Sequence, residues 1–158
     1  MKIEIREVVE KYSTMLLQIS FQRTFSKFDS EDIVQETFIK LMKNSQKIDS
    51  EEHLKYWLIK VTINLCNDYN KSFWKKNITE LDENQSEFNT EEVNLLKEIN
   101  KLKPKYRDVI YLFFFQGFKI KEISEILKMK ENTVSSNLSR ARENLKMILG
   151  EGGDFDVK

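Results

Sequence analysis

The sequence has few of the residues that form turns, disulfide bonds or metal sites. Its 158 residues include one proline, four glycines, one cysteine and one histidine. An all-β fold needs turn residues at regular short intervals, so their scarcity disfavours such a fold. A single cysteine excludes an intramolecular disulfide, and the chain lacks the four-ligand spacing of a zinc module. We therefore assign no metal and no cofactor, and expect a helical protein.

Long apolar runs are also missing, and we expect no leader segment. The densest apolar run, YLFFF at 111–115, is far shorter than the roughly 18 residues that a membrane-spanning helix needs. The first residues, MKIEIREVVEKY, carry charges throughout and do not resemble a signal peptide. We expect a cytoplasmic protein with no membrane insertion, folded as one compact domain or two small ones.

The net charge is zero, but the charges are unevenly distributed along the chain. Lysine and arginine number 26, and so do aspartate and glutamate. This balance argues against a nucleic-acid binder that relies on bulk positive charge. By segment, however, residues 1–76 carry +2, residues 77–95 carry −6, residues 96–150 carry +6 and residues 151–158 carry −2. We hypothesise that the acidic stretch screens a basic C-terminal module until a partner separates them.

The same boundaries predict the domain organisation. We expect an N-terminal domain at 1–76, an acidic linker at 77–95, a C-terminal domain at 96–150 and a tail at 151–158. The linker has scattered apolar residues and no sustained helical stripe. The alternative is that it forms a poorly patterned helix of one continuous domain. The predicted fold class is all-α, with two small helical domains.

The first half has three segments with apolar residues at helical spacing. The second is expected at about 31–43, capped by Asp29 or Ser30, and the third at about 52–72. Trp57 lies on the apolar stripe of the third helix, so we expect it in the core. The three predicted stripes are Val9, Tyr12, Leu16 and Ile19; then Val34, Phe38 and Leu41; then Leu54, Trp57 or Leu58, Val61, Leu65 and Tyr69.

The second half ends in a helix-turn-helix pattern. Pro104 suits the first turn of a helix that ends near Gly117, with Tyr106, Val109, Ile110 and Phe113 or Phe114 turned inward. A short helix, the turn KMKEN and a helix at about 132–149 follow. Basic residues on the outside of the last helix are typical of this DNA-binding motif. The last helix is expected to bury Val134, Leu138, Ala141, Leu145 and Ile148.

Four motifs, in this order, resemble bacterial sigma factors of the extracytoplasmic-function (ECF) group. The polymerase-clamp-binding segment of that family is similar to SEDIVQETFIKLMK at 30–43. Its promoter-melting helix is similar to YWLIKVTINLCNDYNK at 56–71. The opening of its C-terminal domain is similar to LKPKYRDVIYL at 102–112, and its recognition helix to TVSSNLSRARENL at 133–145. Each motif alone is weak, but together they cover both halves of the chain at the expected separations.

The resemblance implies a protein that binds core RNA polymerase at its clamp and flap. It would direct the polymerase to promoter DNA and open the duplex, without being an enzyme itself. Asp32, Gln35 and Glu36 would contact the clamp. An anti-sigma factor or another targeting partner is common in the family, although no residue of this sequence reports one.

Melting at the −10 element requires unstacked bases to be held on the protein. Aromatic faces and amide side chains do this, while cations follow the phosphates. The side chains with this chemistry on or just after the third helix are Lys60, Asn64, Lys71 and Trp74. Plain solvation of a polar helix face is the alternative explanation.

The last helix departs from the family pattern. Family members usually carry arginine or lysine at position 135 and often at 137, where this chain has serine and asparagine. Two interpretations stay open: the helix reads an A·T-rich −35 element through small side chains, or direct readout is weak and a partner supplies targeting. The candidate −35 contacts are Thr133, Ser135, Ser136, Ser139 and Arg140.

Two other function classes are compatible with parts of the sequence. A stand-alone helix-turn-helix regulator with an N-terminal dimerisation or sensing domain would explain the second half. It would not explain the DIVQETF and WLIKVTIN patterns of the first half. An enzyme is disfavoured because the sequence offers no nucleophile–base pair, metal cluster or glycine-rich phosphate loop.

Overall fold

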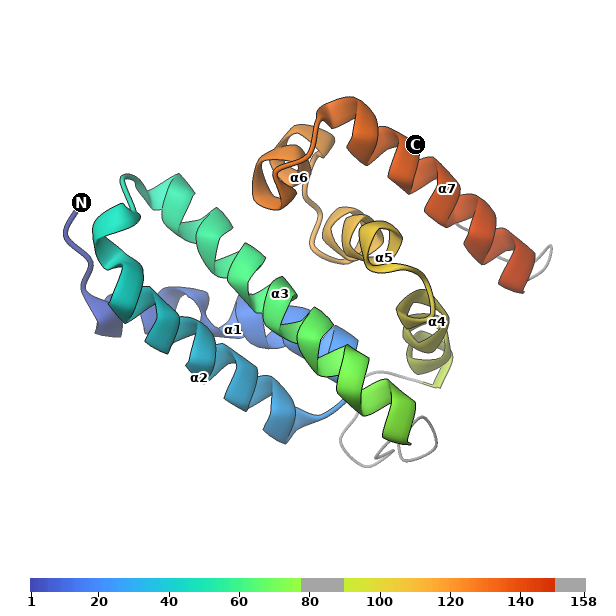
Figure 1. The fold of residues 1–158 in the computed structure, drawn as a ribbon, viewed down its shortest axis with the longest axis horizontal. Coiled ribbons are helices and arrows are strands. Elements are labelled where there is room, and N and C mark those ends of the chain that lie inside the picture. The colour runs from blue at the N-terminus through green and yellow to red at the C-terminus, as the bar shows by residue number, and fades with distance from the viewer. Residues whose placement is uncertain (78–89, 150–158) are drawn as a thin grey trace. The chain divides into compact units, whose positions relative to one another are not determined.

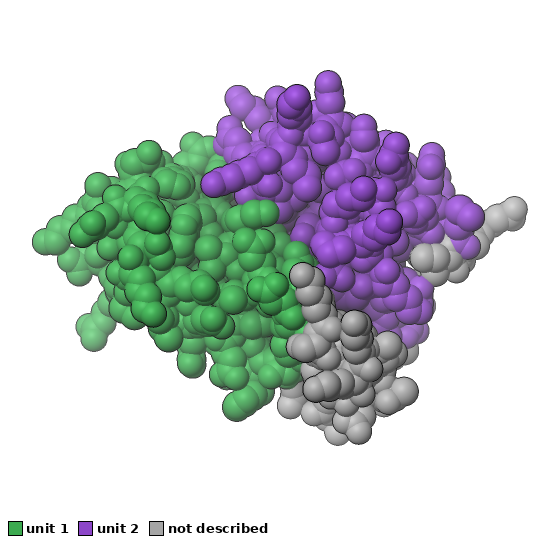
Figure 2. All heavy atoms as spheres, in the orientation of Figure 1, with its two compact units in different colours: residues 1–87 green, residues 88–158 purple. Residues whose placement is uncertain are grey.

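The computed structural model is built from helices. It describes the backbone of residues 1–77 and 90–149, and the side chains of residues 1–69 and 91–147. Those residues contain no β-strand, so the expected all-α fold is confirmed. The chain divides into two compact units, Met1–Glu87 (unit 1) and Phe88–Lys158 (unit 2), which Figure 2 colours separately.

Unit 1 is a bundle of three helices, α1 (Ile5–Thr24), α2 (Lys27–Asn44) and α3 (Glu51–Asn77), with a short 3-10 turn, η1 (Ser45–Lys47), after α2. Each helix packs against the other two, and Figure 1 shows α2 and α3 lying side by side across α1. The first predicted stripe is confirmed except that Val8, and not Val9, is buried. The apolar core consists mainly of Val8, Tyr12, Leu16, Ile19, Ile33, Val34, Phe38, Leu41, Leu54, Leu58, Ile59, Ile63 and Cys66.

Helix α2 begins one turn earlier than its sequence predicts. Its cap is Ser26, whose side-chain oxygen accepts a hydrogen bond from the Asp29 backbone N–H at 3.1 Å. The expected cap Ser30 is instead buried, and its hydroxyl donates to the Ser26 carbonyl at 2.7 Å. The prediction was wrong because Phe28, in the first turn of α2, is apolar but exposed. The apolar pattern therefore did not show that the helix already begins before Asp29.

The buried face of α3 also differs from the predicted stripe. Trp57, Val61 and Leu65 are only half-buried, so the expectation of Trp57 in the core was wrong. Leu58, Ile59, Ile63 and Cys66 are fully buried. Thr62 is fully buried among them, and its hydroxyl lies 3.0 Å from that of Thr37 on α2. The buried face of α3 therefore includes one polar residue that an apolar pattern does not indicate.

Unit 2 contains α4 (Thr90–Asn100), α5 (Pro104–Ile110), α6 (Ile120–Leu127) and α7 (Glu131–Leu149). Helix α7 packs on α4, α5 and α6, and α6, a short turn and α7 form the predicted helix-turn-helix. The expected linker, 77–95, includes the first turns of α4, and its residues 78–89 lie outside the described part of the chain, as does the tail. The buried residues of α7 include Val134, Leu138, Ala141 and Leu145, as predicted. The side chain of Ile148 is not among those described.

A π-helical turn, η3 (Tyr111–Phe115), follows α5 directly. The Gln116 backbone N–H donates to the Tyr111 carbonyl, five residues earlier, at 3.1 Å. A π turn adds a residue and changes which side chains face inward. The buried run is 107–112, of which 109–112 are apolar or aromatic, while Phe113 and Phe114 are half-exposed. The predicted inward positions of Phe113 and Phe114 were wrong for this reason. The prediction for Tyr106, which lies in α5 before the π turn and is also half-exposed, was wrong as well.

The turns that link the helices use left-handed backbone at two residues other than glycine. Phe25, between α1 and α2, and Lys128, between α6 and α7, both have φ of 54°. Gly117, at the end of the predicted α5 helix, has φ of 73° and fits the expected terminating role. Among the described residues, no helix is long and apolar enough to cross a membrane.

Candidate polymerase and DNA surfaces

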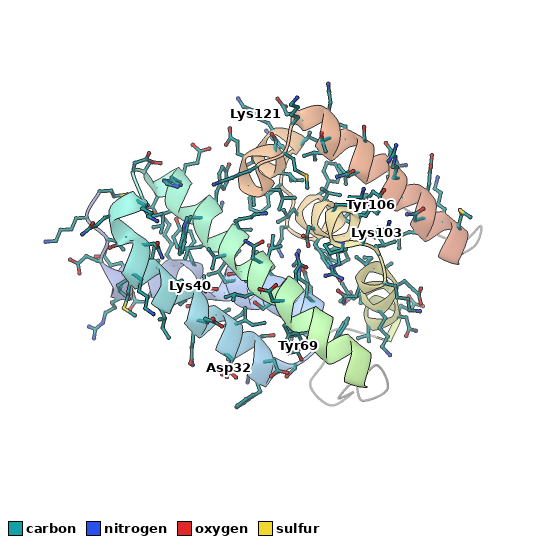
Figure 3. All side chains as sticks on the ribbon, viewed as in Figure 1. Asp32, Lys40, Tyr69, Lys103, Tyr106 and Lys121 are labelled. Carbon is teal, nitrogen blue, oxygen red and sulfur yellow. The ribbon has the colours of Figure 1, made fainter. Side chains whose placement is uncertain are left out.

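One exposed face of α2 carries the residues expected to bind the polymerase. Asp32, Gln35 and Glu36 are all exposed, because the opposite side of the helix is buried through Ile33, Val34, Thr37, Phe38 and Leu41. Figure 3 shows Asp32 and Lys40 along this helix. The acidic and amide groups therefore form a surface patch and have no part in the core.

The structure adds apolar residues to this patch that sequence analysis missed. Phe28, Ile39 and Met42 are 70%, 47% and 53% exposed. Together with Asp32 and Gln35 they recur at intervals of three and four residues, which places them on one side of a helix. We call these five residues the α2 patch. In the sequence, the sign of this patch was that Phe28, Ile39 and Met42 are apolar but do not belong to the predicted buried stripe.

The start of α2 is fixed to α3 by a hydrogen bond. The Tyr69 hydroxyl donates to the Asp29 Oδ2 atom at 2.7 Å, and Tyr69 and Asp32 lie near the same end of the bundle in Figure 3. Burial, and then the Asp29 carboxylate, raise the pKa of Tyr69 well above its usual range. The phenol therefore stays neutral and acts as a hydrogen-bond donor.

The outer face of α3 brings together part of the expected −10 site. Asn64 is exposed and Lys60 half-buried. Trp57 and Val61 share this side of the helix, at spacings of three and four residues from Lys60 and Asn64. The side chains of Lys71 and Trp74 lie outside those described, although both positions fall within α3. The half-exposed Trp57 is thus a further aromatic candidate on this face.

The first turn of α3 is tied to α1 through Glu51. Its Oε1 atom accepts hydrogen bonds from the Lys11 ammonium at 2.7 Å and from the Tyr12 hydroxyl at 2.6 Å. The hydrogen bond from Lys11, and then that from Tyr12, lower the pKa of Glu51. This contact fixes the direction in which α3 leaves the preceding loop.

All five candidate −35 residues are exposed on α7. Thr133, Ser135, Ser136 and Ser139 lie in its first turns, and Arg140 follows. Asn137 is different, because it is buried and its amide nitrogen lies 3.9 Å from the Met129 sulfur. Position 137 therefore packs against the turn of the helix-turn-helix.

Arg140 lies near Tyr106 of α5. The Arg140 side chain, and then the nearby Lys105 ammonium, lower the pKa of Tyr106. The Lys105 Nζ atom lies over the Tyr106 ring, 5.0 Å from the ring centroid. Tyr106 and Lys103 lie beside each other in Figure 3. They form part of an open groove lined by Lys101, Leu102, Lys103, Tyr106, Asn144 and Met147.

Four exposed lysines surround the helix-turn-helix. Lys119 and Lys121 lie at the start of α6, and Lys128 and Lys130 lie in the turn before α7. Lys119 replaces a side-chain cap, and its backbone N–H donates to the Glu122 carboxylate at 3.0 Å. Within the described residues, no three His, Cys, Asp or Glu side chains are grouped to hold a metal ion.

Comparison with known proteins assigns the family. A family model described as Sigma-70 region 2 matches residues 8–75, and one described as Sigma-70, region 4 matches residues 92–145. The ECF RNA polymerase sigma factor SigM of Bacillus subtilis (strain 168) is 28% identical over 160 residues, which cover 94% of this chain and 96% of SigM. The chain belongs to the sigma-70 family, in its extracytoplasmic-function group.

Further similarities agree with this sigma-factor assignment. RNA polymerase sigma factor SigZ of the same strain is 30% identical over 129 residues, covering 75% of this chain and 72% of SigZ. A solved structure of the sigma factor RpoE from Bartonella quintana, in complex with the anti-sigma factor NepR, has a TM-score of 0.68 at 18% identity, covering 94% of this chain and 98% of that one. The region 2 match in the first half is not explained by a stand-alone helix-turn-helix regulator, so that alternative is not favoured.

Proposed function

We propose that this sigma factor binds core RNA polymerase in the cytoplasm, delivers it to promoter DNA and opens the duplex at the −10 element. Polymerase performs the chemistry, and the sigma factor itself is not an enzyme. The observation that carries the proposal is the presence of region 2 and region 4 matches, in that order, on the two helical units.

The α2 patch is the proposed contact with the polymerase clamp. It combines exposed aromatic and aliphatic side chains with Asp32 and Gln35, and Glu36 lies next to it. Exposed apolar groups with a polar rim are typical of protein–protein interfaces. The apolar residues would supply burial, while the carboxylates and the amide would set orientation.

The outer face of α3 is the proposed −10 surface. Asn64 offers a donor and an acceptor on a short side chain, and Lys60 lies one turn away. An aromatic ring, such as that of Trp57, provides a stacking surface for an unpaired base. We propose the same role for Trp74, and phosphate contact for Lys71, within the C-terminal part of α3.

Unit 2 is proposed to dock near the polymerase flap and to present α7 to the −35 major groove. The exposed lysines around the helix-turn-helix are well suited to phosphate contacts, which fix orientation and register. An anti-sigma factor is a further proposed partner, by analogy with the solved complex of RpoE with NepR.

Run-off transcription tests the proposal. Purified core polymerase is combined with the full chain and with genomic fragments from the native host, and transcript ends are mapped. We expect discrete starts that depend on the added chain. A helix-turn-helix regulator would give none without a second sigma factor. Core polymerase alone is the control, and identical transcripts with and without the chain would overturn the proposal.

A further inference from the structure

We infer that α7 reads A·T base pairs through Asn132 and Thr133, and that residues 131–139 at its start contain no arginine or lysine to read guanine. This inference rests on the proposed function, because it specifies the base pairs that the −35 surface accepts. It decides between the two interpretations that the sequence leaves open for the recognition helix.

The first turns of α7 expose only short polar side chains and one carboxylate. The exposed positions are Glu131, Asn132, Thr133, Ser135, Ser136 and Ser139. In the major groove, guanine presents two acceptors, N7 and O6, which arginine or lysine binds through paired donors. None of the exposed side chains in these turns is a cation, and a carboxylate is itself an acceptor. The paired donors of arginine or lysine, the usual readers of guanine, are therefore absent from these turns.

The same turns do carry groups that suit adenine and thymine. An asparagine amide can donate to adenine N7 and accept from adenine N6, which is the bidentate contact typical of this base. Asn132 is exposed in the first turn and is available for it. Thr133 is its exposed neighbour, and its methyl group can pack on the thymine C5-methyl group. Serine hydroxyls discriminate little, but their small size lets the helix approach the base edges.

The structure accounts for the two positions where a cation could have reached guanine. Asn137 is buried against Met129, so a longer side chain there would have to displace the turn. Arg140 is exposed and lies seven residues beyond Thr133, roughly 10 Å further along the helix axis. At that distance from the first turns of α7 it suits a phosphate contact.

In this arrangement, phosphate contacts supply most of the affinity for DNA. The Asn132 amide and the hydroxyl groups of α7 select the base pairs. Lys119, Lys121, Lys128 and Lys130 surround the motif. Such contacts depend strongly on salt and are independent of base sequence. The expected −35 element is a run of A·T pairs without an obligatory G·C pair.

The experiment is selection from a pool of duplexes randomised at the −35 region. It is performed with the holoenzyme, and in parallel with the full chain alone, at one stated salt concentration. We expect enrichment of A·T pairs at adjacent positions with no fixed G·C pair. A fixed G·C pair overturns the inference, and so does a pool that shows no enrichment with either protein.

Base analogues and matched variants then locate the contact. Replacing the selected adenine by 7-deazaadenine, which lacks N7 but keeps the N6 amino group, should weaken binding roughly fivefold, the loss of one of the two hydrogen bonds. Asn132→Ala should abolish that analogue effect. Asn94→Ala is the control, because it removes the same amide from an exposed position on α4. An analogue effect that survives in Asn132→Ala would contradict the assignment.

A gain-of-function variant gives a second, independent result. Ser135→Arg places a guanidinium on the exposed face, and we expect it to enrich a guanine that the original chain does not select. Run-off transcription distinguishes a failure of this inference from a failure of the proposed function. Normal transcription from promoters with an essential −35 guanine would overturn this inference and leave the proposed function intact. Absence of chain-dependent transcription would overturn the proposed function.

Discussion

Tyr69 on α3 donates a 2.7 Å hydrogen bond to Asp29 in the first turn of α2. This contact joins the helix proposed to melt DNA to the helix proposed to bind the polymerase. Asp29 is also the residue whose backbone N–H is capped by Ser26. The start of α2 is therefore fixed both by its own cap and by a neighbouring helix.

Removing the Tyr69 hydroxyl should destabilise unit 1 and change how its stability depends on pH. We expect Tyr69→Phe to lower the free energy of unfolding by about 1 kcal/mol, the usual contribution of one hydrogen bond. The folded-state pKa of Tyr69 is raised above the unfolded value near 10. Tyr69 thus contributes stability below about pH 10 that is lost as the pH rises further.

Urea denaturation of the original chain and of Tyr69→Phe between pH 7 and 11 measures this effect. The stability difference between the original chain and Tyr69→Phe should shrink above about pH 10. Lysines titrate in both proteins, and their effect cancels in the difference. A difference that stays constant across this range would contradict the prediction.

The buried hydroxyl pair between α2 and α3 should respond asymmetrically to substitution. Thr37 donates to the Ile33 carbonyl at 3.0 Å, so Thr62 must donate to Thr37 across the helix interface. Thr37→Val leaves the Thr62 hydroxyl without its partner and should cost about 1–2 kcal/mol. Thr62→Val leaves Thr37 bonded to Ile33, so its cost should be smaller. A double-mutant cycle by denaturation checks this, and equal costs for the two substitutions would count against it.

Lys128 should show a conflict between stability and DNA binding. Its φ of 54° lies in the left-handed region that glycine adopts without a steric penalty. We expect Lys128→Gly to stabilise the fold by about 0.5–1 kcal/mol, and to reduce the slope of log affinity against log salt by about one. Calorimetry and salt titrations of DNA binding measure the two effects.

A matched variant separates the two contributions of Lys128. Lys128→Ala removes the same charge but keeps a β-carbon in the left-handed region. It should change the salt slope as Lys128→Gly does, without the gain in stability. Equal stability of the two variants would show that the backbone conformation is not the cause.

The α2 patch should affect polymerase binding without affecting the fold. Gln35→Ala with Glu36→Lys should weaken the binding of core polymerase about tenfold, which corresponds to the loss of about 1.4 kcal/mol of interface contacts. Ile39→Asp tests the apolar part in the same way. The exposed pair Gln18→Ala with Glu10→Lys on α1 makes the same change of charge elsewhere on unit 1. Fluorescence anisotropy gives the affinity and circular dichroism the helicity, and equal affinities for the two pairs would overturn the assignment.

Periodicity predicted the helices well where packing is continuous and apolar. In α7 the predicted residues Val134, Leu138, Ala141 and Leu145 are all buried, because the helix is regular throughout and packs on three neighbours. In α1 the predicted stripe was wrong only at Val9, because Val8 is buried instead. The motif order of the two halves was also sufficient to predict the family.

Other features depend on contacts that periodicity does not contain. The π turn after α5 exposes Phe113 and Phe114 through one extra residue per turn, which a fixed period of 3.6 cannot anticipate. The Thr37–Thr62 hydroxyl pair on the buried face of α3 joins residues 25 positions apart, so no local pattern in the sequence indicates it.

The burial of Cys66 makes this sigma factor convenient for site-specific labelling. Its thiol is fully buried within α3, and it is the only cysteine of the chain. Thiol reagents need an accessible thiolate, so a cysteine introduced at an exposed site should react much faster than Cys66. Dyes placed on Gln18 of unit 1, which lies outside the α2 patch, and on Met147 of unit 2, each substituted by cysteine, would report the separation of the two units before and after polymerase binding.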